Sequence, residues 1–345
     1  MKILNLTTIL FIGLSLLFTI CIKAGYSIYL DKYSKKAFYV LERKEYELKN
    51  INDVYDYSIK SISKKDYEKF TKNLDKQSKK ELYFIMDTSL LILNAKDLGH
   101  KYVQPFNNRQ AQEIKHFHKF IDSKKVISED MVQYGAYNFP TSDIFEHVLY
   151  NKLGLKNIKN KSKLKNKAII DARAYLGESS VVLSEYTNNK VYAFEPVDEN
   201  FEKLLKTIQF NNLNEKIIPI KMYLSEKKGE KTLLADKKLD DKTTSNTNNK
   251  KYFVNSTSID KFVKENNLKV GIIKCDINGN EMNLLKGAEK TILEQKPVLV
   301  ISIYHCGKDF FEIKNWIENL NLKYKFKIIR TKPDDILYKT VLIAD

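Results

Sequence analysis

Short apolar runs rich in β-branched residues alternate with amphipathic stretches along the chain from residue 166 onward. Amphipathic stretches of about 10 to 15 residues between such runs are typical of βαβ units, in which helices cover a parallel sheet. The runs expected to form strands are residues 167–170, 190–194, 217–220, 270–275, 298–303, 324–330 and 337–343. The stretches expected to form helices are residues 176–186, 199–211, 258–266, 281–294 and 308–320. This alternation predicts an α/β fold with a sheet of seven strands.

Prolines and polar residues indicate where this sheet ends. Pro219 lies inside the third run, and because proline cannot donate a hydrogen bond to a neighbouring strand, it predicts an edge strand. The last two runs are separated by Pro333-Asp334-Asp335, which predicts an antiparallel hairpin. Residues 236–251 are rich in Asp, Lys, Thr and Asn, so we expect them to form a solvated loop or hairpin.

The segment Ile3–Ile22 contains no charged residue. As a helix it would measure about 30 Å, the thickness of a bilayer core. A cleaved signal peptide would need small residues around Cys21, and a lipoprotein-type Cys21 would follow a small residue rather than Ile20. We therefore predict an uncleaved, single-pass transmembrane anchor over residues 1–23.

The charges around this segment predict its orientation. Four lysines follow it within fourteen residues, at positions 23, 32, 35 and 36, opposed by Asp31, whereas Lys2 alone precedes it. Because positive residues favour the cytoplasmic side, the bulk of the chain is expected in the cytoplasm, attached to the membrane. A second apolar run, 82–95, is too short to span a bilayer and contains Asp87, so it predicts a buried helix.

Residues 24–130 have mostly helical periodicity and carry no catalytic motif. We therefore expect three regions: the anchor at 1–23, a mainly helical region at 24–130, and the α/β domain at 131–345. His116 and His118 would point in different directions on a helix, and the cysteines show no C-x-x-C spacing. We assign no metal ligand.

The net charge of +16, from 59 Lys and Arg against 43 Asp and Glu, raises the question of nucleic acid binding. The excess consists mostly of lysines scattered along the whole chain, and arginine-rich stretches are missing. We therefore expect no nucleic acid partner.

Polar residues directly follow four of the expected parallel strands, where open α/β sheets bind their ligands. Asp171, Glu195, Asp276 and His305 occupy these positions. An acidic residue such as Glu195 can accept hydrogen bonds from both hydroxyls of an adenosine ribose. A dinucleotide would need several glycines in the first loop, where only Gly177 is present. This favours a sulfonium cofactor, S-adenosylmethionine, over the alternative of a nucleotide-dependent oxidoreductase.

Four segments in this part of the chain carry a specific resemblance. They read VYAFEPVDENF at 191–201, IKCDINGNE at 273–281, LKGAE at 285–289 and KPVLV at 296–300. In this order and spacing they resemble the FkbM family of S-adenosylmethionine-dependent methyltransferases, over about residues 165–345. The resemblance implies a Rossmann-like methyltransferase sheet of seven strands with a C-terminal antiparallel hairpin. It also implies methyl transfer to hydroxyl oxygens of sugars and secondary metabolites.

The predicted site divides into cofactor-binding and catalytic residues. Asp171, Gly177, Glu195 and Asp276 are expected to bind S-adenosylmethionine, although Asp171 could instead cap the first helix. Asp276 is also expected to orient the reacting groups. His305 is the best-placed base for an acceptor hydroxyl, with a purely structural histidine as the alternative.

Two residues depart from the family's pattern. Arg173 replaces the first glycine of an Asp-x-Gly-Ala-x-x-Gly loop, and Asn278 replaces the usual glutamate of an Asp-Val-Glu-Gly stretch. The Arg173 guanidinium could fill the cofactor site or turn outward to contact the cofactor's carboxylate. Two hypotheses follow: a membrane-anchored methyltransferase acting on a glycan, glycolipid or related hydroxyl acceptor, or a degenerate methyltransferase domain serving as a binding or scaffold module. The sequence leaves the oligomeric state open.

Overall fold

The computed structural model describes residues 45–97, 106–158, 161–226, 231–235 and 251–345. In that part of the chain, no helix combines the length and the apolar character needed to cross a membrane. The anchor predicted at residues 1–23 lies outside the described residues.

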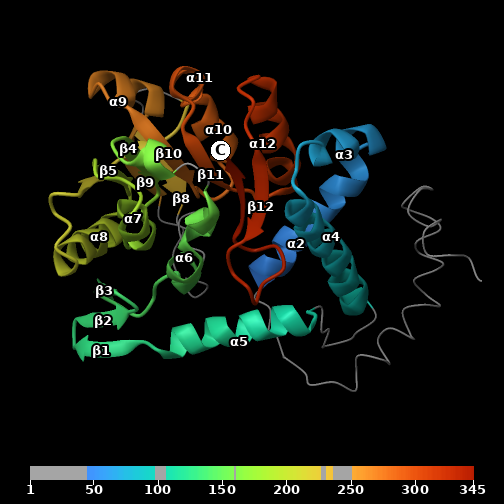
Figure 1. Ribbon diagram of the computed structural model, residues 1–345, viewed down its shortest axis with the longest axis horizontal. Coiled ribbons are helices and arrows are strands. Elements are labelled where there is room, and N and C mark those ends of the chain that lie inside the picture. The colour runs from blue at the N-terminus through green and yellow to red at the C-terminus, as the bar shows by residue number, and fades with distance from the viewer. Residues whose placement is uncertain (1–44, 98–105, 159–160, 227–230, 236–250) are drawn as a thin grey trace, which may run out of the picture.

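A seven-stranded sheet forms the centre of the protein, in the order β12-β13-β11-β10-β4-β5-β6 (Figure 1). The strands are β4 (Ala168–Ala172), β5 (Val191–Phe194), β6 (Ile217–Ile220), β10 (Val270–Cys275), β11 (Val298–Ser302), β12 (Phe326–Arg330) and β13 (Thr340–Ala344). β11, β10, β4, β5 and β6 run parallel. β13 pairs antiparallel with both β11 and β12. All seven predicted strands, the terminal hairpin and the edge position of the strand with Pro219 are confirmed.

The helices between these strands follow the prediction with one exception. They are α7 (Glu178–Ser184), α8 (Asp198–Phe210), α9 (Ile259–Glu265), α10 (Glu281–Lys286), α11 (Glu289–Gln295) and α12 (Gly307–Asn319). A single helix over 281–294 was expected, and this was wrong. The carboxylate of Asp260 accepts the backbone N–H groups of Lys290 and Thr291 at 3.0 and 2.7 Å. These bonds cap a new helix and so separate α11 from α10.

Two small sheets were not expected from the sequence. β1 (Lys125–Ser128), β2 (Met131–Tyr134) and β3 (Tyr137–Phe139) form an antiparallel sheet, so the predicted border at residue 130 falls in the turn between β1 and β2. The second contains β7 (Tyr223–Leu224), β8 (Lys231–Ala235) and β9 (Lys251–Thr257). β8 and β9 pair antiparallel, while residues 236–250 of the predicted loop lie outside the described residues.

The N-terminal helices pack against the end of the sheet that carries β12. They are α2 (Glu45–Ser61), α3 (Lys64–Thr71) and α4 (Lys76–Asp97), whereas the next helix, α5 (Asn108–Asp122), contacts α6 (Glu146–Asn151). Figure 1 shows α2, α3 and α4 beside α12 and β12. Phe70 of α3 lies edge-on to Phe311 of α12, with ring centroids 5.4 Å apart, and both rings belong to one buried core. The described residues 45–97 and 108–122 are mainly helical, and their core is continuous with that of the α/β unit.

The contact between α2 and α12 predicts a destabilising substitution at Gly307. The Gly307 N–H donates to the Asp53 carboxylate at 2.7 Å, and a Cβ added at Gly307 would overlap the side chain of Tyr57. Gly307→Ala is therefore expected to lower the free energy of unfolding by about 1–3 kcal/mol, as measured by urea denaturation. Lys308→Ala, at the exposed next position of the same helix, is the control and should stay within about 0.5 kcal/mol of the parent. Equal stability of the two variants would contradict this packing.

Candidate functional site

A cavity opens at the carboxyl ends of the parallel strands, on both sides of the boundary between β4 and β10. The chain runs from β4 to β5 and β6 on one side and later returns to β10 and β11 on the other. Such a switch point is where open α/β sheets bind ligands. The cavity has a volume of about 560 Å³, open solvent included, and among its walls are Arg173, Tyr175, Lys274, Asp276 and Lys339.

Asp171 lies beneath this cavity rather than in its wall. Its completely buried carboxylate accepts hydrogen bonds from the hydroxyls of Ser179 and Ser180, at 2.6 and 2.7 Å, in the first turn of α7. The buried ammonium of Lys274 lies 3.1 Å from the same carboxylate. Asp171 therefore links β4 to α7 and to β10. This structural role is close to the alternative stated for it above, the capping of the first helix.

The loop after β4 has a left-handed backbone at three residues, with φ of 64° at Arg173, 52° at Tyr175 and 99° at Gly177. Gly177 also packs closely on α8, because an added Cβ would lie 3.0 Å from Thr207. Its lack of a side chain therefore serves the turn and the contact with α8.

Glu195 follows β5, and its carboxylate is turned under this loop. It is completely buried and accepts the backbone N–H groups of Tyr175 and Val197 at 2.9 and 3.1 Å. Burial raises the pKa of Glu195 to about 7, against the opposing effects of the Arg173 charge and of these hydrogen bonds. A ribose could reach this carboxylate only after the loop at Tyr175 moves.

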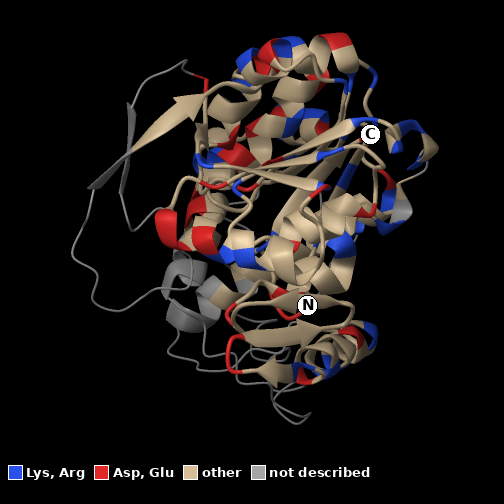
Figure 2. Cartoon of the chain, turned by 90° about the vertical axis from the view of Figure 1, so that its left-hand side faces the viewer, with Lys and Arg blue, Asp and Glu red and all other residues tan. Residues whose placement is uncertain are grey.

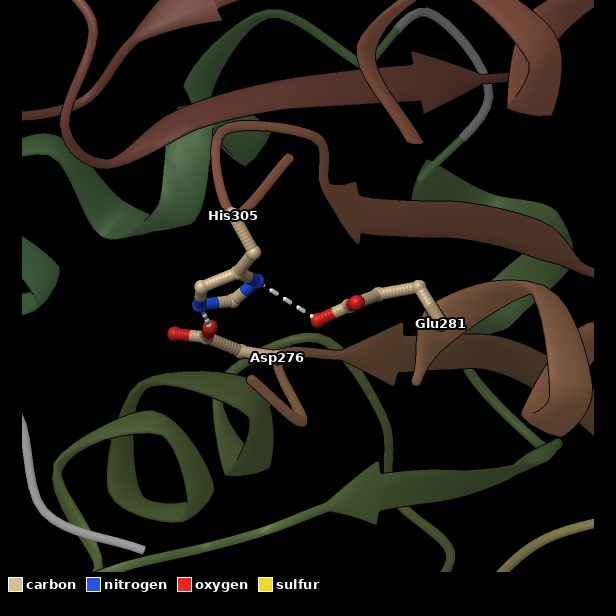
Figure 3. A group of neighbouring side chains, drawn as sticks. All are labelled: Asp276, Glu281 and His305. Carbon is tan, nitrogen blue, oxygen red and sulfur yellow. Dashed lines mark ion pairs between the residues drawn. The ribbon is translucent and has the colours of Figure 1, made fainter. Parts of the chain in front are cut away.

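His305 lies between two carboxylates, those of Asp276 and Glu281, as Figure 3 shows. Its Nδ1 is 2.8 Å from Glu281 Oε1, and its Nε2 is 3.4 Å from Asp276 Oδ1. Glu281 also accepts the backbone N–H of Ile277 at 2.9 Å. This hydrogen bond holds the Glu281 carboxylate next to Nδ1 of His305. The structure thus brings together the two predicted catalytic residues, His305 and Asp276, with Asp276 in the cavity wall.

Asp276 is held in its charged form by the cations around it. Burial alone would raise its pKa, but Lys339, His305, Lys274 and Arg173 together hold the pKa of Asp276 well below its usual range. The atom types of Asp276, Glu281 and His305 would suit a metal ion. The ammonium of Lys339, 3.5 Å from Asp276, competes for the same carboxylate and so opposes a second cation there.

Lys339 and the aromatic rings around it were missed by sequence reasoning. Its buried ammonium lies 4.4 Å from the ring centroid of Phe145 and 4.5 Å from that of Tyr338, and it donates to the hydroxyl of Tyr304. That hydroxyl in turn donates to Asp276 at 3.2 Å. In the sequence, Lys339 stands out only as a lysine just before an apolar run. It reaches the site because β13 lies beside β11 in the sheet, and this strand order could not be predicted.

Arg173 and Asn278, the two departures from the family's pattern, contact each other. The Nη1 of Arg173 donates a hydrogen bond to Oδ1 of Asn278. This bond joins the loop after β4 to the loop after β10 across the switch point. Neither residue is fully buried.

Acidic and basic residues are interspersed over the face of the protein that Figure 2 shows. Some of these residues form ion pairs, for example Lys152 with Glu185 at 2.6 Å and Lys203 with Glu199 at 2.7 Å. The described part of the chain therefore shows residues of both signs in this view.

Comparison with known proteins identifies the α/β unit. Residues 170–326 match the methyltransferase FkbM domain. The structure of a methyltransferase FkbM from Methylobacillus flagellatus KT is similar with a TM-score of 0.54 and 19% identity, over 86% of this chain and 62% of that one. This similarity establishes the fold. No curated protein matches the chain.

Two more distant structures are methyltransferases that act on tRNA. A tRNA m1G37 methyltransferase from Methanocaldococcus jannaschii has a TM-score of 0.34 and 14% identity, over 62% of this chain and 54% of that one. A tRNA (uracil-54, C5)-methyltransferase from Pyrococcus abyssi, in complex with S-adenosyl-L-homocysteine, has a TM-score of 0.34 and 12% identity, over 62% and 44%. This chain spans about three fifths of the length of the FkbM structure and about half of these two.

Proposed function

Because residues 170–326 of this chain are a methyltransferase FkbM domain, we propose that the protein transfers a methyl group from S-adenosylmethionine to a hydroxyl oxygen of a glycan, glycolipid or related metabolite. The observation that carries the proposal is that Glu195, Asp276 and His305 follow β5, β10 and β11 on the two sides of the switch point of the sheet, with His305 3.4 Å from Asp276 in the cavity wall. A carboxylate at the end of β5 and another at the end of β10 suit a ligand with a ribose and a positive charge.

The residues present fit this cofactor. Glu195 would accept the ribose hydroxyls in place of the backbone N–H of Tyr175, to which it is bound in this structure. Asp276, whose pKa is held well below its usual range, would stabilise positive charge in the cavity at any physiological pH. When bound, S-adenosylmethionine supplies a methyl group on a cationic sulfur, so the protein's main task is to align the acceptor and to exclude water.

His305 and Asp276 would handle the proton of the acceptor. Asp276 lies in the cavity wall and can accept a hydrogen bond from an acceptor hydroxyl, which orients the attacking oxygen. When its ring is neutral, His305, whose Nε2 lies 3.4 Å from Asp276, can take up the proton that the hydroxyl loses. The ammonium of Lys339 beside them would favour negative charge on that oxygen.

We also propose where in the cell the protein acts. The predicted anchor at residues 1–23 would hold the domain at the cytoplasmic face of a membrane, where a lipid-linked acceptor would be concentrated. In this proposal the methyl group is accepted by a glycan or small molecule that carries a hydroxyl group.

A degenerate binding module is the second candidate, and two observations favour it. Arg173 bridges the loops on both sides of the switch point, and Glu195 is covered by the loop at Tyr175. Both features would have to change before a cofactor could bind.

Calorimetric titration of the purified chain with S-adenosylmethionine and S-adenosylhomocysteine tests the proposal. We expect both to bind, with micromolar dissociation constants. Absence of binding by a chain shown by circular dichroism to be folded would favour the degenerate module. Once binding is found, transfer of labelled methyl groups to membrane lipid and glycan fractions would identify the acceptor.

A further inference from the structure

β1 (Lys125–Ser128) is the edge strand of the small antiparallel sheet, whose order is β1-β2-β3. Figure 1 shows it at the margin of the molecule, with β2 and β3 between it and the main sheet. An edge strand presents backbone N–H and C=O groups to which another strand can add. We propose that β1 is an interface at which a second copy of this chain pairs, with the two β1 strands side by side and antiparallel.

The first support is the exposure of apolar side chains on this edge. Residues 122–130 are all exposed, and within them Val126 and Ile127 are 72% and 50% exposed. The other large apolar residues that are exposed in the described part of the chain lie singly on α2, α4, α8 and α11. They are Ile59, Tyr83, Leu205 and Leu293. Single exposed apolar residues are common, whereas two neighbours at the centre of an edge strand offer a surface that a partner can cover.

The second support is the charge at the two ends of the strand, which selects the partner. Lys124 and Lys125 stand at its start, and Glu129 and Asp130 follow its end in the turn to β2. When two identical strands pair antiparallel about a two-fold axis, the start of each strand lies opposite the end of the other. With the axis at Ile127, Lys125 lies opposite Glu129. In the same register Lys124 lies opposite Asp130, so the segment is complementary to itself.

The same features distinguish this pairing from the usual protection of an edge. Charged residues and bulges generally keep other strands away, and the pairing of β1 with β2 does shift between Val126 and Ser128. Repulsion of an added strand, however, requires that like charges meet. Two copies of β1 would bring lysine against lysine only in a parallel arrangement. The charges therefore oppose parallel addition and favour antiparallel addition of a second copy.

Sedimentation velocity of the full chain in detergent solution measures this association. β1 contains four residues, and because so short a strand covers a small area, we expect a weak monomer–dimer equilibrium that is detectable at concentrations up to about 100 µM. Parent and variants share every residue outside β1 and its flanks, so a difference between them reports on this edge.

Reversal of the charges at one end tests the complementarity. Lys124→Glu with Lys125→Glu makes both ends of the strand acidic, whereas Glu129→Lys with Asp130→Lys makes both ends basic. Each double variant should associate with itself at least about tenfold more weakly than the parent, because like charges then meet at both ends of the pair. An equal mixture of the two double variants should form a heterodimer, which also shows that both remain folded.

The matched control reverses all four charges in one chain. This quadruple variant has acidic residues at the start of β1 and basic residues after its end, so two copies are again complementary when antiparallel. It should dimerise about as strongly as the parent, although each of its two component double variants does not.

Three results would overturn the inference. A parent chain that stays monomeric over this range would show that the edge is covered or inert. Dimerisation that neither double variant weakens would place the contact on another surface. Double variants that stay monomeric even when mixed would show that charge complementarity does not form the contact. These measurements need no cofactor or acceptor, so their outcome is independent of the proposed function.

Discussion

Replacing Lys274 by methionine is expected to lower the free energy of unfolding by about 3–5 kcal/mol, which is the usual effect of removing one partner of a buried ion pair. The ammonium lies 3.1 Å from the completely buried carboxylate of Asp171 and donates to the backbone carbonyl of Arg173 at 2.8 Å. The hydroxyls of Ser179 and Ser180 would remain as hydrogen-bond donors to Asp171, but its charge would have no counterion in that position. Urea denaturation at pH 7 measures the effect.

Two controls show whether the buried charge is responsible. Lys203→Met breaks the exposed pair with Glu199, at 2.7 Å, and should change the stability by less than about 1 kcal/mol. The double variant Lys274→Met with Asp171→Leu removes both charges and should recover much of the loss. If Lys274→Met and Lys203→Met behaved alike, the ion pair beneath the cavity would have no energetic importance.

Glu195→Gln is expected to weaken binding of S-adenosylhomocysteine by about 100-fold at pH 8, because two hydrogen bonds from ribose hydroxyls to a charged acceptor are lost. The parent should also bind about ten times more tightly at pH 8 than at pH 6. Burial raises the pKa of Glu195 to about 7, so the ionised form that accepts these bonds is the minor species at pH 6 and the major one at pH 8. Titrations at both pH values would test this, and equal pH dependence in parent and variant would contradict the role of Glu195.

The same carboxyl group should affect stability, with a sign fixed by the direction of its pKa shift. A folded-state pKa of about 7 lies above the usual value for glutamate, so the folded protein binds this proton more tightly than the unfolded chain. Its contribution is therefore complete below about pH 4.5 and is lost as the pH rises to about 7, by up to about 3 kcal/mol. Glu195→Gln should remove this part of the pH dependence, so that parent and variant diverge between these pH values.

The strands could be predicted from the sequence because their signal is local, whereas the contacts of the site could not. Each run of apolar residues indicates its own strand, and topology then places Glu195 and Asp276 at strand ends. The Glu195 carboxylate is oriented by its hydrogen bond to Tyr175, which lies in a left-handed turn. No residue pattern in the sequence predicted this turn. From the sequence, Asp171 could equally bind a ligand or cap a helix. Its actual partners, Ser179 and Ser180 of α7, could not be identified because a loop separates them from Asp171.

Long-range pairing explains the remaining differences. The first N–H groups of α11, after the break near Gly287, are bound by Asp260, which lies in another helix, so periodicity within 281–294 could not reveal this contact. Lys339 enters the site because β13 lies between β11 and β12, an order that sequence patterns do not specify. The contact between Arg173 and Asn278 joins residues 105 positions apart, although both had been noted separately as departures from the family's pattern.

The packing of the N-terminal helices on α12 and β12 has a consequence for how the chain folds during synthesis. Asp53 and its partner Gly307 are 254 positions apart, and β12 joins the sheet through β13, which follows it in the chain. The apolar faces of α2 and α3, including Ile51 and Phe70, therefore leave the ribosome long before the surface that covers them exists. During that interval these faces are exposed, and transiently exposed apolar surface of this kind favours aggregation of folding intermediates.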